Sequence, residues 1–428
     1  MRKKRQKYNT ALLIGMLLDC SLTGCGKTEA GGPLPTQRAE QSETAESVRQ
    51  PEADSTGIAT PEPTATPISD ISATPEPVEF PVEITETVFP EELLRKKALA
   101  ADSDGDGCLN KEEAEAVTKL SLKKLADADA KDDREGMPLP EYTKEDFIFD
   151  FEGIQYFTEL TELTVNLLGG EAFVKEEPEE IFAVTRNFSR IYECRKIEKL
   201  SLYEADVTSL ELFHFPDLKR LDLNCMYRLE GLDAGTHQKL SSLWISQCNR
   251  LETLDVSGAE KLKTLDLVQN DSLKAVRFGE GNKTLETIQL NGLPCLSEAE
   301  FSCLENLISL NLTEVSLAGL DVSKNTKLEQ LCAEGLELDT LDLRNNPNIE
   351  YLINAKDSFK EILLPEENRV SMIRWTESSV TEFPVTNLNP ETLVGIDIQG
   401  TAIKKLDVSG FPNLEHLYYD EDVTEIVR

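Results

Sequence analysis

The pattern L-x-x-L-x-L, with Ile or Val allowed at each apolar position, recurs along the C-terminal half of this chain. Its copies are 21 to 23 residues apart and begin at Ile197, Leu218, Leu240, Leu262, Leu285, Leu307, Leu328, Ile349, Val370, Leu393 and Leu414. One unit of this length cannot bury its own leucines. Stacked units bury a continuous core, and the stability is then a sum of contacts between neighbours. The repeats therefore constrain the chain to a solenoid.

Most units carry a second strand-like segment about 11 residues after the first, as at 251–256, 317–322 and 403–408. Each unit should therefore contain two short extended edges and almost no helix. This period and this pattern are the signature of leucine-rich repeats. An earlier copy begins at Leu160. We predict a leucine-rich-repeat solenoid over residues 151–428, mostly β, with short strands stacked in a curved sheet.

The outward positions of the first strand follow from strand alternation, which places the fifth residue of L-x-x-L-x-L on the surface. This position holds Ser201, Asp222, Trp244, Asp266, Gln289, Asn311, Cys332, Ile353, Arg374, Asp397 and Tyr418. Trp375, at position six, should be core. Trp, Tyr and Arg are the types enriched in interface hot spots. We predict ligand binding at Trp244, Arg374 and Tyr418, with Trp244 as the anchor; the alternative is that a neighbouring segment covers Trp244.

An acidic column follows the second segments. Its members are Asp233, Asp255, Asp321, Asp342 and Asp407, with Arg277 and Glu300 between them. One interpretation is a stripe that attracts cations. The other is that each Asp caps the following turn by a bond from its side chain to the backbone. We favour turn capping, because Asp followed by Val-Ser is the usual consensus sequence at this position of such repeats.

Residues 102–113, Asp-Ser-Asp-Gly-Asp-Gly-Cys-Leu-Asn-Lys-Glu-Glu, match the calcium loop of an EF-hand. The predicted metal ligands are Asp102, Asp104, Asp106, the Cys108 carbonyl, Asn110 and Glu113. Gly107 stands where the loop must turn sharply. Four crowded carboxylates repel one another unless a cation lies between them. We predict one Ca²⁺ in an EF-hand-like helix-loop-helix cap over residues 81–122; the alternative is a solvated acidic turn. The acidic insertion 123–150 contains a second acidic run, 127–133, which lacks the loop glycine and is predicted to be a solvated loop.

Residues 1–25 have the features of an export signal: a basic start, a short apolar stretch at 11–18, and Leu22-Thr23-Gly24-Cys25. The last four residues resemble the lipobox of bacterial lipoproteins, in which the cysteine is lipidated. The resemblance implies lipidation of Cys25 and a place at the extracellular face of the bacterial cell membrane; the alternative is an ordinary secretion signal. Residues 26–80 are rich in Pro, Thr, Ser and Glu and are predicted to be a disordered linker.

The chain resembles bacterial surface leucine-rich-repeat proteins of the internalin-like kind. The resemblance lies in the order of its parts: a helix-loop-helix, then the segments 117–122 and 151–160, then L-D-V-S repeats. In that family such a cap opens the solenoid. The resemblance covers roughly residues 80–428 and implies an extracellular binding surface rather than an enzyme. The acidic insertion departs from the family pattern. The ladder asparagine is expected at Asn270, Asn325 and Asn346, and other units have Met226, Cys248, Leu293 and Val315 instead.

The formal net charge of −35 disfavours attraction to nucleic acid. The three histidines, His214, His237 and His416, stand apart in the sequence without metal-binding spacing. We therefore predict a membrane-anchored, non-enzymatic protein that captures a protein or glycan ligand on its solenoid. The alternatives are a glycan-active hydrolase that uses carboxylates and a purely structural envelope protein.

Overall fold

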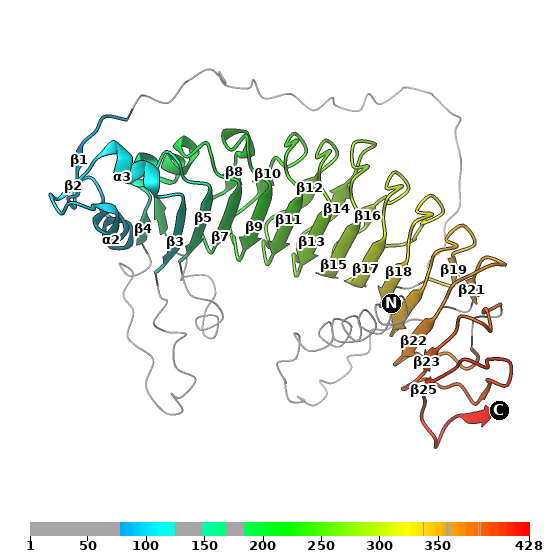
Figure 1. Cartoon of the computed structure of the whole chain (residues 1–428). Helices are drawn as coiled ribbons and strands as arrows, with labels where there is room; N and C mark the ends of the chain where they lie inside the picture. Colours follow the sequence, from blue (N-terminus) through cyan, green and yellow to red (C-terminus); the bar gives the residue numbers. More distant parts are fainter. Residues whose placement is uncertain are drawn as a thin grey trace, which may run out of the picture. The chain divides into compact units, whose positions relative to one another are not determined.

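The computed structural model describes residues 78–124, 148–167, 184–336, 338–356, 359, 361–383, 385 and 387–428, all within the compact unit Ala73–Arg428. They form a parallel β-solenoid of about 10 turns with few helices (Figure 1), which confirms the predicted leucine-rich-repeat architecture. The predicted signal peptide with Cys25, nearly all of the predicted linker and residues 125–147 of the insertion lie outside the described residues.

Among the described residues, thirteen parallel strands form what we call the main sheet. They are β3 Lys119–Lys123, β5 Glu162–Asn166, β7 Lys199–Tyr203, β9 Arg220–Asn224, β11 Ser242–Ser246, β13 Thr264–Val268, β15 Thr287–Leu293, β17 Ser309–Val315, β18 Gln330–Glu334, β20 Tyr351–Ala355, β22 Met372–Thr376, β23 Gly395–Asp397 and β25 His416–Tyr418. Successive strands pair in register, so Leu221, Leu243 and Leu265 are direct neighbours, each at most 1% exposed. Equivalent leucines therefore form continuous buried rows. Trp375 is fully buried, as predicted.

The second segments form shorter parallel ladders on the other edge of the coils (Figure 1). Their strands are β4 Ile148–Asp150, β6 Val184–Arg186, β8 Ser209–Leu210, β10 Gly231–Leu232, β12 Thr253–Asp255, β14 Ala275–Arg277, β16 Glu298–Ala299, β19 Thr340–Asp342, β21 Glu361–Leu363, β24 Lys405–Asp407 and β26 Glu425–Val427. Single 3₁₀ turns occur at η2 Ile154–Tyr156, η4 Phe188–Glu193 and η5 Leu212–His214. Most coils thus have two extended edges, and the apolar side chains of both edges meet between them.

Two corners of the coil use buried asparagines, and the prediction of a single ladder was wrong. Asn270 follows a main-sheet strand, and its side-chain amide donates to the carbonyl of Ile245 at 3.0 Å. Asn325 and Asn346 instead follow second segments. The Asn325 amide donates to the carbonyls of Phe301 and Leu304 at 2.9 and 2.8 Å. The apolar spacing is the same in both halves of a coil, so the pattern alone does not separate the two corners.

A left-handed residue lies at or just after the C-terminal end of the main-sheet strand in ten successive coils. These residues are Glu204, Cys225, Gln247, Gln269, Gly292, Glu314, Gly335, Lys356, Glu377 and Gly400, with φ between 51° and 77°. Only three of them are glycines, although this region of φ favours glycine. Each coil can hold this conformation because its neighbours repeat it: the Gln247 N–H donates to the carbonyl of Val268 in the next coil at 3.0 Å. Stacking, rather than local preference, sets this corner.

The N-terminal cap consists of β1 Val82–Glu83, α2 Glu92–Ala101, β2 Cys108–Leu109 and α3 Lys111–Ala116. Leu94, Ala98 and Leu109 are fully buried and belong to the core cluster that continues into the solenoid. Strand β3 follows α3 directly and is the first strand of the main sheet, so the sheet begins at Lys119, upstream of the predicted start at residue 151. Within the described segments, no helix has the length and apolar character needed to cross a bilayer.

Candidate functional site

The calcium-type loop lies between two helices of the cap, as predicted. Helix α2 ends at Asp102, which is its C-cap, and α3 begins after Asn110. The Asn110 side chain accepts from the Glu113 N–H at 3.0 Å, and the Glu113 carboxylate accepts from the Asn110 N–H at 3.1 Å. This reciprocal capping box satisfies two backbone donors that the first turn of a helix would leave open. The loop is therefore anchored firmly at its exit.

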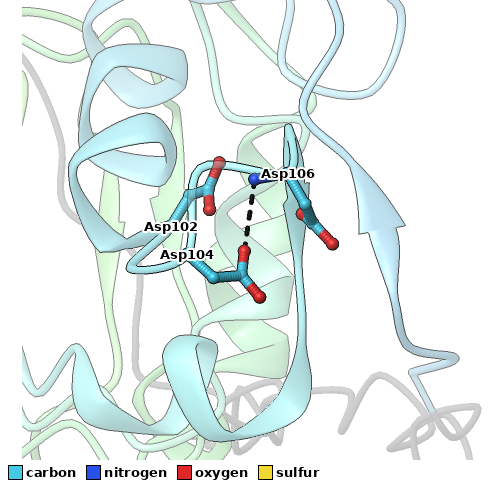
Figure 2. Close-up of side chains that lie close together, drawn as sticks. All are labelled: Asp102, Asp104 and Asp106. Atoms are coloured by element: carbon cyan, nitrogen blue, oxygen red, sulfur yellow. Dashed lines mark hydrogen bonds between the residues drawn. The ribbon is translucent and has the colours of Figure 1, made fainter.

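Asp102, Asp104 and Asp106 converge, and their carboxylate oxygens lie within 4.8 Å of one another (Figure 2). Each carboxylate also holds the turn. Asp102 accepts from the N–H groups of Gly105 and Gly107 at 2.7 and 2.9 Å, and Asp104 accepts from the Asp106 N–H at 3.2 Å. Gly105 and Gly107 have φ of 74° and 80°, which only glycine adopts without strain. Sequence and backbone together thus bring three anionic oxygen donors to one point.

Glu113, the predicted bidentate ligand, makes a different set of contacts. One carboxylate oxygen accepts from the backbone N–H of Ser103 at 2.8 Å and from its hydroxyl at 2.7 Å. The other accepts from Asn110. These bonds, with the Asn110 backbone contact first, lower the pKa of Glu113. Glu113 thus ties the start of the loop to α3 instead of joining the three aspartates. The donor chemistry of the aspartates still suits a hard dication, for which carboxylate oxygens are the preferred ligands.

A short antiparallel ladder supports the loop from outside. Strand β1 pairs with β2, placing Val82 opposite Leu109 and Glu83 opposite Cys108. The Ile84 N–H extends the ladder by donating to the Gly107 carbonyl at 3.0 Å. The segment just before α2 thus supplies a strand along the exit of the loop.

The solvent face of the main sheet carries a hollow of about 380 Å³ around Trp244. The pairing of β9, β11 and β13 places Trp244 directly between Asp222 and Asp266. Its ring centroid lies 6.4 Å from that of Tyr203, which stands two strands away on β7. Trp244 was expected to be exposed and is half-buried. Arg220 and Gln289 also line the hollow.

The two carboxylates beside Trp244 differ in their partners. Asp222 lies on the outward side of the sheet, as predicted, but its neighbours leave it only 3% exposed. It accepts from the Arg220 Nε at 2.9 Å and from the Ser201 hydroxyl at 3.0 Å. Within the described part of the chain, Asp266 Oδ1 is buried without a hydrogen-bond partner. Burial raises the pKa of Asp266 to about 6. One acid is thus compensated from within the sheet, and the other is not.

Arg374 and Tyr418 share this face but lie far from Trp244. Strand β22 is six strands from β11, about 29 Å at ~4.8 Å per strand, and β25 is two strands further. Arg374 forms an ion pair with Asp397 at 3.5 Å, and Tyr418 is 52% exposed. The three predicted residues therefore do not form one pocket. The residues that do gather around Trp244 include Asp222 and Asp266, which the sequence placed in the same column but did not single out.

Four of the five aspartates of the second segments cap turns through the backbone, as predicted; Asp233 instead accepts from the Thr236 hydroxyl. Asp255 Oδ1 accepts from the Ser257 N–H at 2.8 Å, and Asp321 and Asp407 each accept from the amide two residues on at 2.9 Å. The bonds to Ser323 lower the pKa of Asp321, and those to Ser409 lower the pKa of Asp407. This column is therefore part of the coil geometry.

No protein family and no curated protein sequence matches this chain. Among solved structures, the functional domain of InlJ from Listeria monocytogenes, which includes a cysteine ladder, is similar at 18% identity with a TM-score of 0.57, covering 81% of this chain and 72% of that one. The leucine-rich-repeat protein LIC12759 of Leptospira interrogans has a TM-score of 0.44 at 18% identity, over 74% and 86% of the two chains. The InlJ likeness shows that this chain shares the solenoid fold of an internalin-like protein.

Proposed function

We propose that this chain is a cell-surface binding protein that captures a protein partner on the solvent face of the main sheet. The observation that carries the proposal is the hollow around Trp244, where an aromatic ring and an unpaired carboxylate interrupt an otherwise regular surface. Curved repeat proteins use such extended faces for ligands, and half-buried tryptophans are frequent interface anchors. The hollow is open and Asp222 is already paired, which supports binding rather than carboxylate-driven glycan hydrolysis.

The test is capture of extracellular or envelope proteins by the chain from residue 26 onward. We expect Trp244→Ala to weaken binding of a captured partner by about 2 kcal/mol or more, without a change in melting temperature. Phe213→Ala is the control, because Phe213 is an exposed aromatic (51%) that lies outside the main sheet. Partners retained by Trp244→Ala and lost with Phe213→Ala would place the binding surface elsewhere.

Lipid anchoring at Cys25 is the second part of the proposal. It is supported by the lipobox-like residues Leu22, Thr23 and Gly24 before this cysteine. Stable anchoring requires more than one acyl chain, as a lipidated N-terminal cysteine would provide. Cys25→Ala should move the protein from the membrane fraction to the medium. Membrane association unchanged in that variant would contradict anchoring.

One calcium ion in the cap is the third part. The converging aspartates support it, and the affinity expected for such a site is on the order of 10⁻⁴ to 10⁻³ M. Asp104→Asn is a sharper test than Glu113→Ala, because Glu113 also caps α3 and holds Ser103. The asparagine keeps an acceptor for the Asp106 N–H and removes one charge. Calorimetric titration with CaCl₂ should show binding in the parent and in Glu112→Gln, and much weaker binding in Asp104→Asn. Equal heats of binding in all three proteins would contradict a calcium site at these aspartates.

A further inference from the structure

The side chains that line the hollow on the main sheet favour a positively charged ligand. Its floor lies across β9 to β15, and its walls include the rings of Trp244 and Tyr203 and the carboxylates of Asp222 and Asp266. A buried carboxylate without a partner is costly, since it loses hydration and gains no bond in return. Asp266 bears part of this cost: the side chain is half-buried, and its Oδ1 is buried without a hydrogen-bond partner among the described residues. The direct neighbours of Asp266 in its row, Trp244 and Gln289, carry no charge.

Asp222 shows how the same sheet satisfies an acid when no ligand is involved. It stands two strands from Asp266 in the same row, and the Arg220 guanidinium and the Ser201 hydroxyl hold its oxygens. Among the described strands, no equivalent cation serves Asp266: the residue in register with Arg220 on β13 is Thr264, and that on β15 is Thr287. The missing partner of Asp266 is therefore a group with the chemistry that Arg220 provides to Asp222.

We propose that the hollow binds the guanidinium of an arginine side chain on the partner protein, through an ion pair with Asp266 and a contact with the Trp244 ring. A guanidinium is planar, pairs with a carboxylate and stacks on aromatic faces, whereas an ammonium is more strongly hydrated. The net charge of −35 favours the approach of a basic partner. This inference rests on the proposed binding role of the main sheet and adds the chemistry of the group that is recognised.

Proton binding by Asp266 gives the inference a second signature. Burial holds its pKa at about 6, so the carboxylate is mostly ionised at pH 7.5 and mostly protonated at pH 5. The other titratable or charged groups that line the hollow are Arg220, Asp222 and Tyr203. Burial raises the pKa of Tyr203, so its phenol stays neutral over this range, and Asp222 accepts a hydrogen bond from the Arg220 guanidinium. Guanidinium binding should therefore weaken roughly tenfold from pH 7.5 to pH 5.

Tryptophan fluorescence can report binding directly, because the chain has two tryptophans and Trp375 is fully buried in the core. The probes are the blocked peptides acetyl-Gly-Gly-Arg-Gly-Gly-amide and its lysine and citrulline versions, titrated to millimolar concentrations into the chain from residue 26 onward. Citrulline keeps the shape of arginine and removes the charge. We expect the arginine peptide to bind at least tenfold more tightly than the citrulline peptide, with lysine between them.

Two variants distinguish the effect of the Asp266 carboxylate from that of the negative charge of the whole protein. Asp266→Asn should weaken the arginine peptide at least fivefold and abolish the pH dependence, while Asp321→Asn, on the other edge of the coil, should leave both unchanged. Equal affinity for the arginine and citrulline peptides, no binding of any peptide, or undiminished binding by Asp266→Asn would overturn the inference. If the arginine inference is overturned but a captured partner still requires Trp244, the proposed binding surface is retained. Only the assignment of a guanidinium as the bound group is then wrong.

Discussion

Asp266 should destabilise the fold at neutral pH, and its replacement by asparagine should therefore stabilise it. The pKa of this carboxyl rises from an ordinary 3.8 to about 6. At 1.36 kcal/mol per pKa unit, the full shift corresponds to about 3 kcal/mol. Part of the side chain remains in contact with water, which reduces the penalty, so we expect Asp266→Asn to gain about 1 to 2 kcal/mol at pH 7.5.

The sign of the pH dependence follows from proton binding. Between about pH 4 and pH 6 the folded chain retains a proton on Asp266 that the unfolded chain has lost, so stability falls as pH rises through this window. The gain from Asp266→Asn should therefore be present at pH 7.5 and nearly absent at pH 4. Comparing parent and variant at each pH cancels the contributions of the other carboxylates.

Urea unfolding followed by circular dichroism is the assay, since guanidinium salts would screen charges and compete for the hollow. Asp222→Asn is the matched control, because it loses half of an ion pair with Arg220 and should be destabilising. The reasoning would be refuted if Asp266→Asn were no more stable than the parent at pH 7.5, or if its advantage were equal at both pH values. A variant that is more stable but binds arginine less well would show the cost of keeping a binding group buried.

Three further predictions concern the frame that carries this site. Leu265→Ala and Leu341→Ala, each at a side chain 1% exposed, should each cost ~2 to 5 kcal/mol, whereas Thr264→Ala on the solvent face should cost little; small losses at both leucines in urea titrations would contradict a continuous core. Asn325→Ala should cost about 2 to 4 kcal/mol by leaving the carbonyls of Phe301 and Leu304 unpaired, and the exposed donor Asn348, changed to Ala, is its control; similar melting temperatures for the two variants would count against the second-corner ladder. Gly153→Ala should lower the melting temperature of the cap, because φ is 101° and an added Cβ would lie 2.4 Å from the Phe89 ring, while Gly319→Ala meets nothing within 4 Å; unchanged protease resistance of residues 78–124 in Gly153→Ala would argue against this contact.

The cap loop and the solenoid differ in how far the sequence could predict them. In the loop, the three aspartates are only two residues apart in the sequence, so the local turn alone brings them together. Asp102, Asp104 and Asp106 converge as the motif indicated. Glu113 was predicted as a metal ligand; the structure shows its carboxylate accepting from Ser103 and Asn110, and its role toward a metal stays a prediction. Local spacing predicts which groups are near one another, but the competition among nearby donors depends on atomic positions.

On the main sheet, the sequence identified the column that holds Trp244 but not the contacts made across it. It placed Asp222 correctly on the outward side but did not reveal that this carboxylate is covered and paired with Arg220. It grouped Arg374 and Tyr418 with Trp244 although they lie six and eight strands away. Strand alternation fixes only the side of the sheet toward which a residue points. Whether a neighbouring coil covers that residue depends on side chains about 20 residues away in the chain.

The sequence by itself determined the solenoid, because a regular period of leucines leaves stacking as the one way to bury them. It also determined the turn-capping aspartates and the fully buried Trp375, since both depend on positions within one coil. Only the tertiary structure decided the left-handed corner, the separate asparagine ladders and the unpaired state of Asp266. These features arise between coils, where in-register stacking brings together residues whose partners are not specified by their neighbours in the sequence.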